Sequence, residues 1–288
     1  MFFIIGMLSL VFLGGISTGP GKGNVAVIDI TGAITTQDAS GFGAVQASSS
    51  RIVNFIETAD SDNRVSAILF RINSGGGSPV ATEEIASAIQ NTNKTTVAVI
   101  RDTGASGAYW VASATDTIFA SRMSIVGSIG VTGSNFGIDE LLEEYNVTYR
   151  RLVTGEYKDI GSPFKEMTDE ERLLFQERLE VLHRIFAETI ADNRNLTDEE
   201  ISKIANGLFW TGMQAKDIGL IDEFGGEREA LKYIEEKLGI KAEAVEYRRD
   251  PSLGDLFFGV FNEMSYQIGK GFGASLSQDR PAHESILI

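Results

Sequence analysis

The chain has 288 residues, of which 43% are hydrophobic, and this length suits one sizeable α/β domain with short additions at its ends. Its formal charge of -15 argues against a nucleic-acid partner, because phosphate binding requires clustered lysine and arginine. The chain has no cysteine and two histidines, His183 and His283, which lie far apart in sequence. Thiol nucleophiles, disulfides and cysteine-based metal sites are therefore excluded, and we expect neither a metal nor a cofactor.

The N-terminal segment differs from the rest of the chain. Residues 1–16 carry no charge and are almost entirely apolar, and extension to residue 19 nearly reaches the roughly 20 residues that cross a bilayer. We expect residues 1–19 to form a membrane anchor. Gly15 and Ser17 are small enough for a cleavage site, so a removed signal peptide is the alternative. No basic residue precedes the segment, and its orientation therefore stays open.

After a glycine-rich linker at 20–24, predicted strands alternate with predicted helices. The strands are expected at 25–30, 65–72, 96–100 and 117–120, and the helices between them at 52–59, 79–90 and 108–114. Residues 35–50, rich in Gly, Ser and Ala, predict a loop. Such alternation is typical of a mostly parallel sheet with right-handed crossovers.

The second half of the chain begins with a predicted helix at 139–145 and a predicted strand at 148–153, which would continue the pattern. Capping boxes at 168–171 and 197–200 each predict a helix start, the first opening a long helix to about residue 194. A strand near 220–222, a helix at 227–238 and a last strand at 242–247 follow. Residues 248–288 carry an apolar cluster near 253–261, expected to serve packing or oligomer contacts, and a tail expected to be disordered.

Two glycine-rich turns, at 73–78 and 102–107, directly follow predicted strands. The carboxyl ends of parallel strands share one edge of a sheet, so these turns can converge on one site. Ser106 lies in the second turn between small residues, where a strand passes into a helix. A nucleophile would fit there, near the positive end of a helix. Serine is also a common helix N-cap, and the local pattern leaves both interpretations open.

A serine nucleophile requires a base. Histidine is the usual partner, but His183 lies within the long helix and His283 in the tail, so a Ser-His-Asp triad is not favoured. A lysine whose pKa is lowered by burial is the alternative. Lys158 lies in a loop at 154–163 with glycines on both sides and Pro163 at its end. The local pattern alone favours a solvated loop lysine.

An oxyanion hole needs backbone N–H groups that a substrate can approach closely, and glycine permits that approach. Gly76 is the first candidate, and the N–H of Gly107 is the second. The same glycine run lacks the Gly-Lys-Ser/Thr ending of a phosphate-binding P-loop.

Four motifs in a fixed order resemble the signal peptide peptidase A family over roughly residues 24–247. They are Arg71-Ile-Asn-Ser-Gly-Gly-Gly77, Gly104-Ala-Ser-Gly-Ala-Tyr109, Gly127-Ser-Ile-Gly-Val131 and Tyr157-Lys-Asp-Ile-Gly-Ser-Pro163. The resemblance implies a membrane-anchored serine protease with a Ser/Lys dyad and a ClpP/crotonase-like fold of repeated β-β-α units. One departure is visible, because Gly75 stands where the family usually has proline.

On this match Ser106 is the nucleophile, Lys158 the general base and Ser128 the serine that hydrogen-bonds the lysine. Gly76 matches the oxyanion-hole glycine, with its N–H free for that role, and Gly107 is a second donor. The expected domains are an anchor at 1–19, a peptidase domain at 20–247 and a C-terminal segment at 248–288.

The resemblance also implies partners and a location. Substrates would be apolar peptides such as remnant signal peptides. Single-domain members form ring-like homo-oligomers in which neighbouring subunits contribute the Ser and the Lys. The protein would lie in the cell membrane with its catalytic domain on the extracytoplasmic side. The alternatives are a related Ser/Lys membrane protease that cleaves a stomatin-type scaffold protein, a crotonase-like acyl-CoA enzyme, and a non-enzymatic membrane-associated assembly protein.

Overall fold

The computed structural model describes residues 23–38 and 46–248. All of these residues except Arg248 belong to one compact unit, residues 20–247. The expected anchor at 1–19 and the apolar cluster near 253–261 lie outside the described residues. Within the described ranges, no helix combines the length and the apolar character needed to cross a bilayer.

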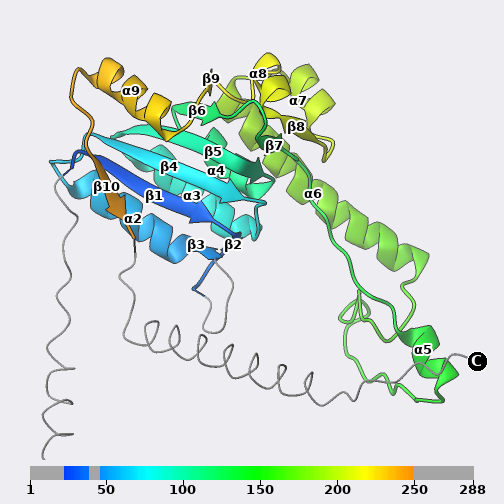
Figure 1. Cartoon of the computed structure of the whole chain (residues 1–288). Helices are drawn as coiled ribbons and strands as arrows, with labels where there is room; N and C mark the ends of the chain where they lie inside the picture. Colours follow the sequence, from blue (N-terminus) through cyan, green and yellow to red (C-terminus); the bar gives the residue numbers. More distant parts are fainter. Residues whose placement is uncertain (1–22, 39–45, 249–288) are drawn as a thin grey trace, which may run out of the picture. The chain divides into compact units, whose positions relative to one another are not determined.

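The main sheet is mostly parallel (Figure 1). Its central path runs in the spatial order β10 (Ala244–Tyr247), β1 (Val25–Thr31), β4 (Ala67–Ser74), β5 (Thr95–Ala105), β6 (Thr117–Ala120) and β9 (Glu223–Phe224). The last residues of β5, which follow those paired with β6, pair in parallel with β7 (Ile125–Gly127). Strand β8 (Phe209–Thr211) pairs antiparallel with β7. A small second sheet joins β2 (Ala33–Thr35) to β3 (Gln46–Ser48) in parallel.

Helices cover both faces of the sheet. The helices in the described residues are α2 (Ser49–Ser61), α3 (Pro79–Asn91), α4 (Gly107–Ser113), α5 (Asp139–Glu144), α6 (Asp169–Arg194), α7 (Asp198–Ile204), α8 (Gly212–Asp217) and α9 (Glu227–Leu238). Helices α2, α3 and α4 lie on one face, and α9 lies on the other (Figure 1). The unit is therefore layered as helix, sheet and helix, which agrees with the predicted α/β class and mostly parallel sheet.

Burial on both faces explains why the strands are continuous apolar runs. In β1, Ala26 and Ile28 belong to the larger core beneath α2 and α3, whereas Val25 and Val27 belong to the smaller core beneath α9. All four side chains are fully buried. Side chains alternate between the faces of a strand, so a strand covered on both sides must be apolar at every position.

Strand β5 is longer than predicted. Residues 102–105 were expected in a turn, but β5 continues to Ala105 because Thr103–Ala105 pair with Ile125–Gly127 of β7. The turn therefore shortens to the single residue Ser106, between the end of β5 and the start of α4.

The predicted strand at 148–153 is wrong. Residues 148–152 are exposed and form no ladder with any strand that the structure describes. An isolated extended segment has nothing to satisfy its backbone groups except water, so an alternating pattern alone does not make a strand. Three smaller differences remain. The expected loop at 35–50 contains β3 and the first residues of α2, and the strand expected at 220–222 lies at Glu223–Phe224. Strand β8 and helix α8 were not predicted.

Both predicted capping boxes are present. Thr168 accepts the N–H of Glu171 and opens α6, and Thr197 does the same for Glu200 at α7. Residues 132–168, which we call the arm, connect β7 to α6 and contain α5. The arm packs on the first half of α6: a Cβ on Gly133 would lie 2.7 Å from the Phe175 ring.

Candidate active site

Ser106 has a strained backbone. Its φ of 53° and ψ of -130° lie where non-glycine residues are rare, and such strain is often concentrated at functional sites. The residue occupies the N-cap position of α4, but its side chain makes no capping hydrogen bond. A plain helix cap would use that hydroxyl, so the structure disfavours the capping interpretation. The side chain is partly exposed.

The structure brings Ser106 and Ser128 together. Strands β5 and β7 pair Ala105 with Gly127, so the two serines leave adjacent parallel strands at the same level. The Ser106 N–H donates to the Gly127 carbonyl at 2.7 Å. Ser128 also has a positive φ, 50°, and its Oγ donates to the Gly207 carbonyl at 3.1 Å.

The two glycine turns converge as predicted. Gly76 has a φ of 97°, and a Cβ there would lie 2.7 Å from the Gly107 nitrogen and 3.0 Å from Ser106 Cβ. The Asn73 side chain holds the turns together where the β4–β5 register shifts. Its Nδ2 donates to Asp102 and its Oδ1 accepts the Thr103 N–H, both at 3.1 Å. Only glycine fits such an approach at position 76.

The N–H of Gly76 is not free, contrary to the expectation from sequence. It donates to Ser74 Oγ at 3.0 Å, because the buried Ser74 hydroxyl folds back into the turn. Gly77 and Gly107 line the cavity beside Ser106. Gly107 begins α4, where an N–H has no partner within the helix, and the Gly77 N–H bonds no other residue that the structure describes.

A cavity of about 290 Å³ opens beside Ser106. Most of its side chains are apolar, and they come from α3, α4, the residue before the arm and α6: Pro79, Val80, Trp110, Val131, Leu182, Ile185 and Phe186. Trp110 and Phe186 stack with ring centroids 5.1 Å apart, which fixes one wall of the cavity. An apolar peptide side chain would find complementary surface here.

Lys158 lies elsewhere in the chain. It is exposed on the arm, and the neighbouring Tyr157 donates its hydroxyl to Glu170 at 2.7 Å, in the first turn of α6. Leu182 of the Ser106 cavity follows Glu170 by 12 residues, a rise of about 18 Å along the helix. Lys158 and Ser106 are therefore not in one site within a single chain.

Of the two histidines, the one that the structure describes contacts a backbone carbonyl. His183 is half-buried on α6, and its Nε2 lies 2.8 Å from the Ala205 carbonyl. His183 does not line the Ser106 cavity. His283 lies outside the described residues. Across residues 23–38 and 46–248, no group of three His, Asp or Glu side chains is placed to hold a metal ion.

Comparison with known protein families shows which family the chain matches. The model of peptidase family S49 matches residues 88–241, which is more than half of the chain. This chain belongs to peptidase family S49. The serine-type peptidase activity that the motifs predict is confirmed, and so is the resemblance to signal peptide peptidase A. The acyl-CoA and non-enzymatic alternatives are thereby set aside.

Three relatives show the extent of the similarity. The chain is 35% identical over 227 residues to a candidate protease of Methanocaldococcus jannaschii, covering 78% of this chain and 72% of that protein. It is 28% identical over 237 residues to a candidate signal peptide peptidase of Enterococcus faecium, covering 81% and 69%. It is 33% identical over 205 residues to Protease 4 of Salmonella typhi, covering 70% of this chain but 33% of that longer protein.

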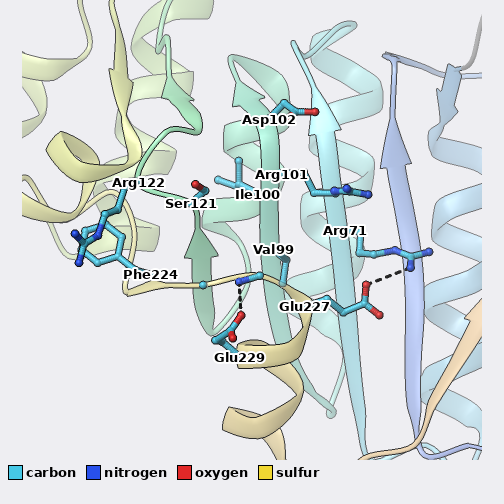
Figure 2. Close-up of a pocket in the computed structure, with 12 residues that line it drawn as sticks. Arg71, Val99, Ile100, Arg101, Asp102, Ser121, Arg122, Phe224, Glu227 and Glu229 are labelled. Carbon is cyan, nitrogen blue, oxygen red and sulfur yellow. Dashed lines mark hydrogen bonds and ion pairs between the residues drawn. The ribbon is translucent and has the colours of Figure 1, made fainter.

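A larger cavity of this S49 peptidase is not lined by Ser106. It measures about 710 Å³ and lies on the α9 face of the sheet, beside Arg71 and Arg101 (Figure 2). Arg71 forms ion pairs with Asp29, Glu227 and Glu246, and these carboxylates raise the pKa of its guanidinium. None of the predicted catalytic residues lines this cavity, so the smaller cavity is the candidate active site.

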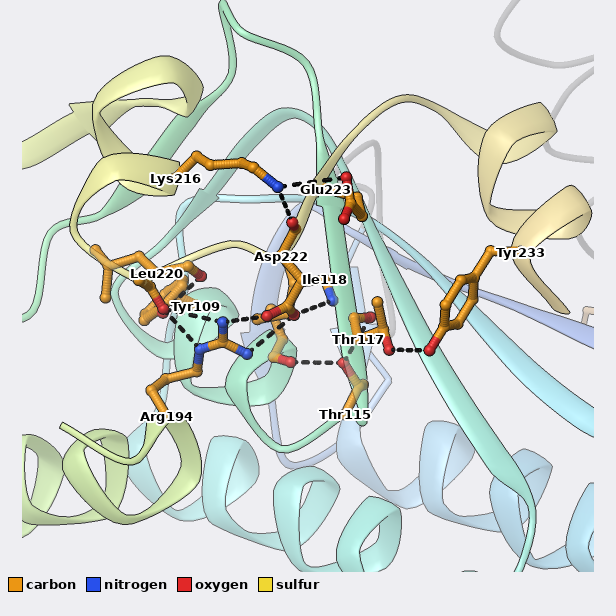
Figure 3. A network of polar contacts seen from close by, with 12 residues as sticks. Tyr109, Thr115, Thr117, Ile118, Arg194, Lys216, Leu220, Asp222, Glu223 and Tyr233 are labelled. Carbon is orange, nitrogen blue, oxygen red and sulfur yellow. Dashed lines mark hydrogen bonds and ion pairs between the residues drawn. The ribbon is translucent and has the colours of Figure 1, made fainter. Parts of the chain in front are cut away.

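A polar network behind α4 was not predicted, because its members are distant in sequence (Figure 3). The buried Tyr109 hydroxyl donates to the Leu220 carbonyl at 2.9 Å. Arg194, at the end of α6, donates to the Gly219 carbonyl at 2.9 Å and forms an ion pair with Asp222 at 2.7 Å. In this S49 peptidase the network joins the helix that follows Ser106 to the end of α6.

Proposed function

We propose that this S49 peptidase is a membrane-anchored endopeptidase that hydrolyses apolar peptides such as remnant signal peptides. Ser106 is the nucleophile, and Lys158 of a neighbouring copy of the chain is the general base. The observation that carries the proposal is the placement of a strained, uncapped serine beside an apolar cavity with no histidine in its lining. A serine in that position needs a proton acceptor from elsewhere.

A second copy as the source of Lys158 is supported by two features of the arm. The first is the separation of about 18 Å along α6 between the level of Lys158 and that of the Ser106 cavity. The second is the exposure of large apolar side chains on the arm, with Phe136 at 89% and Leu152 at 97%. Apolar surface of this kind is typical of a protein interface. A lysine is a base near neutral pH only when it is desolvated, and burial of the arm against another copy would desolvate Lys158.

The mechanism is acyl transfer in two steps. Neutral Lys158 Nζ takes the proton of Ser106 Oγ while Oγ attacks the carbonyl carbon of the substrate. The ammonium then protonates the leaving amine, which yields an ester on Ser106. A water molecule, deprotonated by the same lysine, hydrolyses that ester and releases the second product.

The remaining predicted residues have supporting roles. Gly107 lines the cavity, and its N–H would donate to the oxyanion, with a second donor from the glycine turn at 75–77. Gly76 can donate only if its bond to Ser74 is exchanged for one to the substrate. Ser128 donates its hydroxyl proton to Gly207, so its oxygen stays able to accept a hydrogen bond from Lys158 and orient it.

Membership of the family also supports a role for each of the three segments of the chain. Residues 1–19 would anchor the chain in the cell membrane and residues 20–247 would form the peptidase domain on the extracytoplasmic side. Residues 248–288 would contribute to assembly. The parallel sheet with the small β2–β3 sheet beside it supports a ClpP/crotonase-like arrangement of β-β-α units.

The test uses the full-length chain and an apolar peptide. Ser106→Ala and Lys158→Ala are each expected to lower kcat/KM by at least about 10³-fold. Lys203→Ala is the matched control, because Lys203 is an exposed lysine paired with Glu199 on α7. Hydrolysis near the wild-type rate by either of the first two variants would contradict the proposal.

Mixing the two inactive variants tests the origin of the lysine. Subunit exchange is expected to restore part of the activity, because some interfaces then combine an intact Ser106 with an intact Lys158. No recovery after confirmed exchange would place both residues in one chain. Comparison of membrane peptides with and without the enzyme would separate signal-peptide cleavage from cleavage of a stomatin-type scaffold.

A further inference from the structure

The first turns of α3 form one wall of the Ser106 cavity. Val80 and Glu83 are three residues apart on that helix, lie on the same side and both line the cavity. Thr82 is fully buried between them, and a Cβ on Gly107 would lie 2.5 Å from Thr82 Oγ1. Glu83 is therefore one residue from a direct contact with the nucleophile turn.

Among the described residues that line this cavity, Glu83 is the single charged one. Its carboxylate forms no hydrogen bond or ion pair with another residue in the described part of the chain. No lysine or arginine lines the cavity among the residues that the structure describes. On α6, Arg178 lies four residues before Leu182 and is paired with Glu177 at 3.2 Å. The charge that lines the cavity is therefore a carboxylate on the α3 side.

An apolar wall that ends in a carboxylate fits one class of side chain well. Lysine and arginine carry aliphatic stems that pack on apolar surface while their charged ends remain solvated. Trp110, Leu182 and Ile185 would receive such a stem, and Glu83 would face its cationic end. An aspartate or glutamate side chain would meet the same carboxylate and be repelled.

We propose that Glu83 is a specificity residue, through which the Ser106 cavity accepts lysine and arginine side chains of the substrate as well as apolar ones and disfavours acidic ones. The proposal rests on the proposed function and adds a substrate preference to it. It predicts cleavage where an apolar peptide carries a basic residue at one of the three positions before the scissile bond.

The experiment uses the full-length enzyme and N-acetylated apolar peptides that differ at one position. That position carries norleucine, lysine or glutamate and is placed in turn at each of the three residues before the scissile bond. Norleucine has nearly the lysine stem without its charge. Glu83→Gln is compared with Glu84→Gln, which removes the same charge from the next residue of α3. Glu84 hydrogen-bonds Ser49 and does not line the cavity.

At one of the three positions, Glu83→Gln is expected to lower the lysine-to-norleucine ratio of kcat/KM by about three- to tenfold, the effect of one partly solvated charge pair. The glutamate-to-norleucine ratio should rise, and Glu84→Gln should leave both ratios unchanged. Equal ratios in wild type and Glu83→Gln at all three positions would overturn the proposal.

Two other outcomes would also overturn it. An equal change for every peptide, with a shifted pH profile, would mean that Glu83 acts on the lysine base. An effect that appears only with unacetylated peptides would mean that Glu83 binds the amino terminus of the substrate. If folded and assembled wild type cleaves none of the peptides, the proposed function itself has failed. The norleucine peptide tests this separately, because its cleavage does not depend on the charge of Glu83.

Discussion

The N–H of Ser106 donates a 2.7 Å hydrogen bond to the carbonyl of Gly127, the residue that precedes Ser128. This bond continues the β5–β7 ladder by one step after β5 has ended. It holds Ser106 in a backbone conformation that a free peptide would avoid, and it keeps Ser128 at a fixed position beside Ser106. The site therefore depends on β7, a strand of three residues.

The glycine turn should tolerate a methyl group at one position and not at the next. Gly76→Ala places a Cβ 2.7 Å from the Gly107 nitrogen and requires a φ near 97°. We expect it to lower kcat/KM by roughly 10²-fold, because the turn and the nucleophile must separate. Gly75→Ala is the control: a Cβ there meets nothing within 4 Å, so activity should stay near wild type. Equal activities of the two variants would contradict the packing described here.

The arm should need an ion pair to present Lys158. Arg151 donates to both carboxylate oxygens of Asp159, at 2.6 and 2.8 Å. Asp159 directly follows Lys158 in sequence. Arg151→Gln is expected to lower kcat/KM by about tenfold, because the loop loses its anchor. The free energy of unfolding should change by less than about 1 kcal/mol, as for other surface pairs.

Arg178→Gln is the control for the arm, because it breaks an exposed pair with Glu177 on α6. Peptidase assays and urea unfolding of the two variants provide the comparison. If both variants keep full activity, the Arg151–Asp159 pair does not position Lys158.

The start of α6 should contribute less to the stability of the fold at acidic pH. Glu171 accepts hydrogen bonds from Lys165 at 2.6 Å and from the Thr168 N–H at 3.0 Å, and these contacts hold the pKa of its carboxyl below the usual 4.5. A lowered pKa in the folded state stabilises the fold above about pH 4.5, and this contribution is lost as pH falls through the folded pKa.

Unfolding midpoints of wild type and Glu171→Gln, measured against pH, test this prediction. The two proteins should differ most above pH 4.5 and converge below it. Glu177→Gln, an exposed residue of the same helix, should show no such convergence. A constant difference between wild type and Glu171→Gln at every pH would show that the carboxylate charge contributes nothing.

The network behind α4 should contribute stability more than catalysis. Burial raises the pKa of the Tyr109 hydroxyl, which therefore stays protonated and donates to Leu220. Tyr109→Phe removes this bond and keeps the ring, so we expect a loss of about 1–2 kcal/mol in the free energy of unfolding. Activity per folded molecule should stay within about threefold of wild type.

Tyr233→Phe is the matched control, because its hydroxyl accepts a hydrogen bond from Thr117 at 3.0 Å nearer the surface (Figure 3). Its cost should be smaller, since water replaces a lost partner at a partly exposed site. Equal losses in the two variants, measured by urea unfolding, would argue against a special role for Tyr109.

The sequence by itself determined the features that depend on neighbouring residues. The capping boxes at Thr168 and Thr197 were predicted because their hydrogen bonds span three positions. The parallel sheet was predicted because strands buried on both faces must be apolar throughout. Convergence of the two glycine turns followed from the common edge of parallel strands. The choice of Ser106, Ser128 and Lys158 came from ordered motifs, and their catalytic roles stay predictions.

The tertiary structure alone decided the features that depend on distant partners. The continuation of β5 to Ala105 needed β7, and the failure of the strand at 148–153 came from the lack of a partner for its backbone among the described strands. The bond from Gly76 to Ser74, and the location of Glu83 at the cavity, depend on how turns and helices pack. Local pattern specifies which conformations a segment prefers, but a hydrogen bond or an ion pair forms only where the fold brings its second partner.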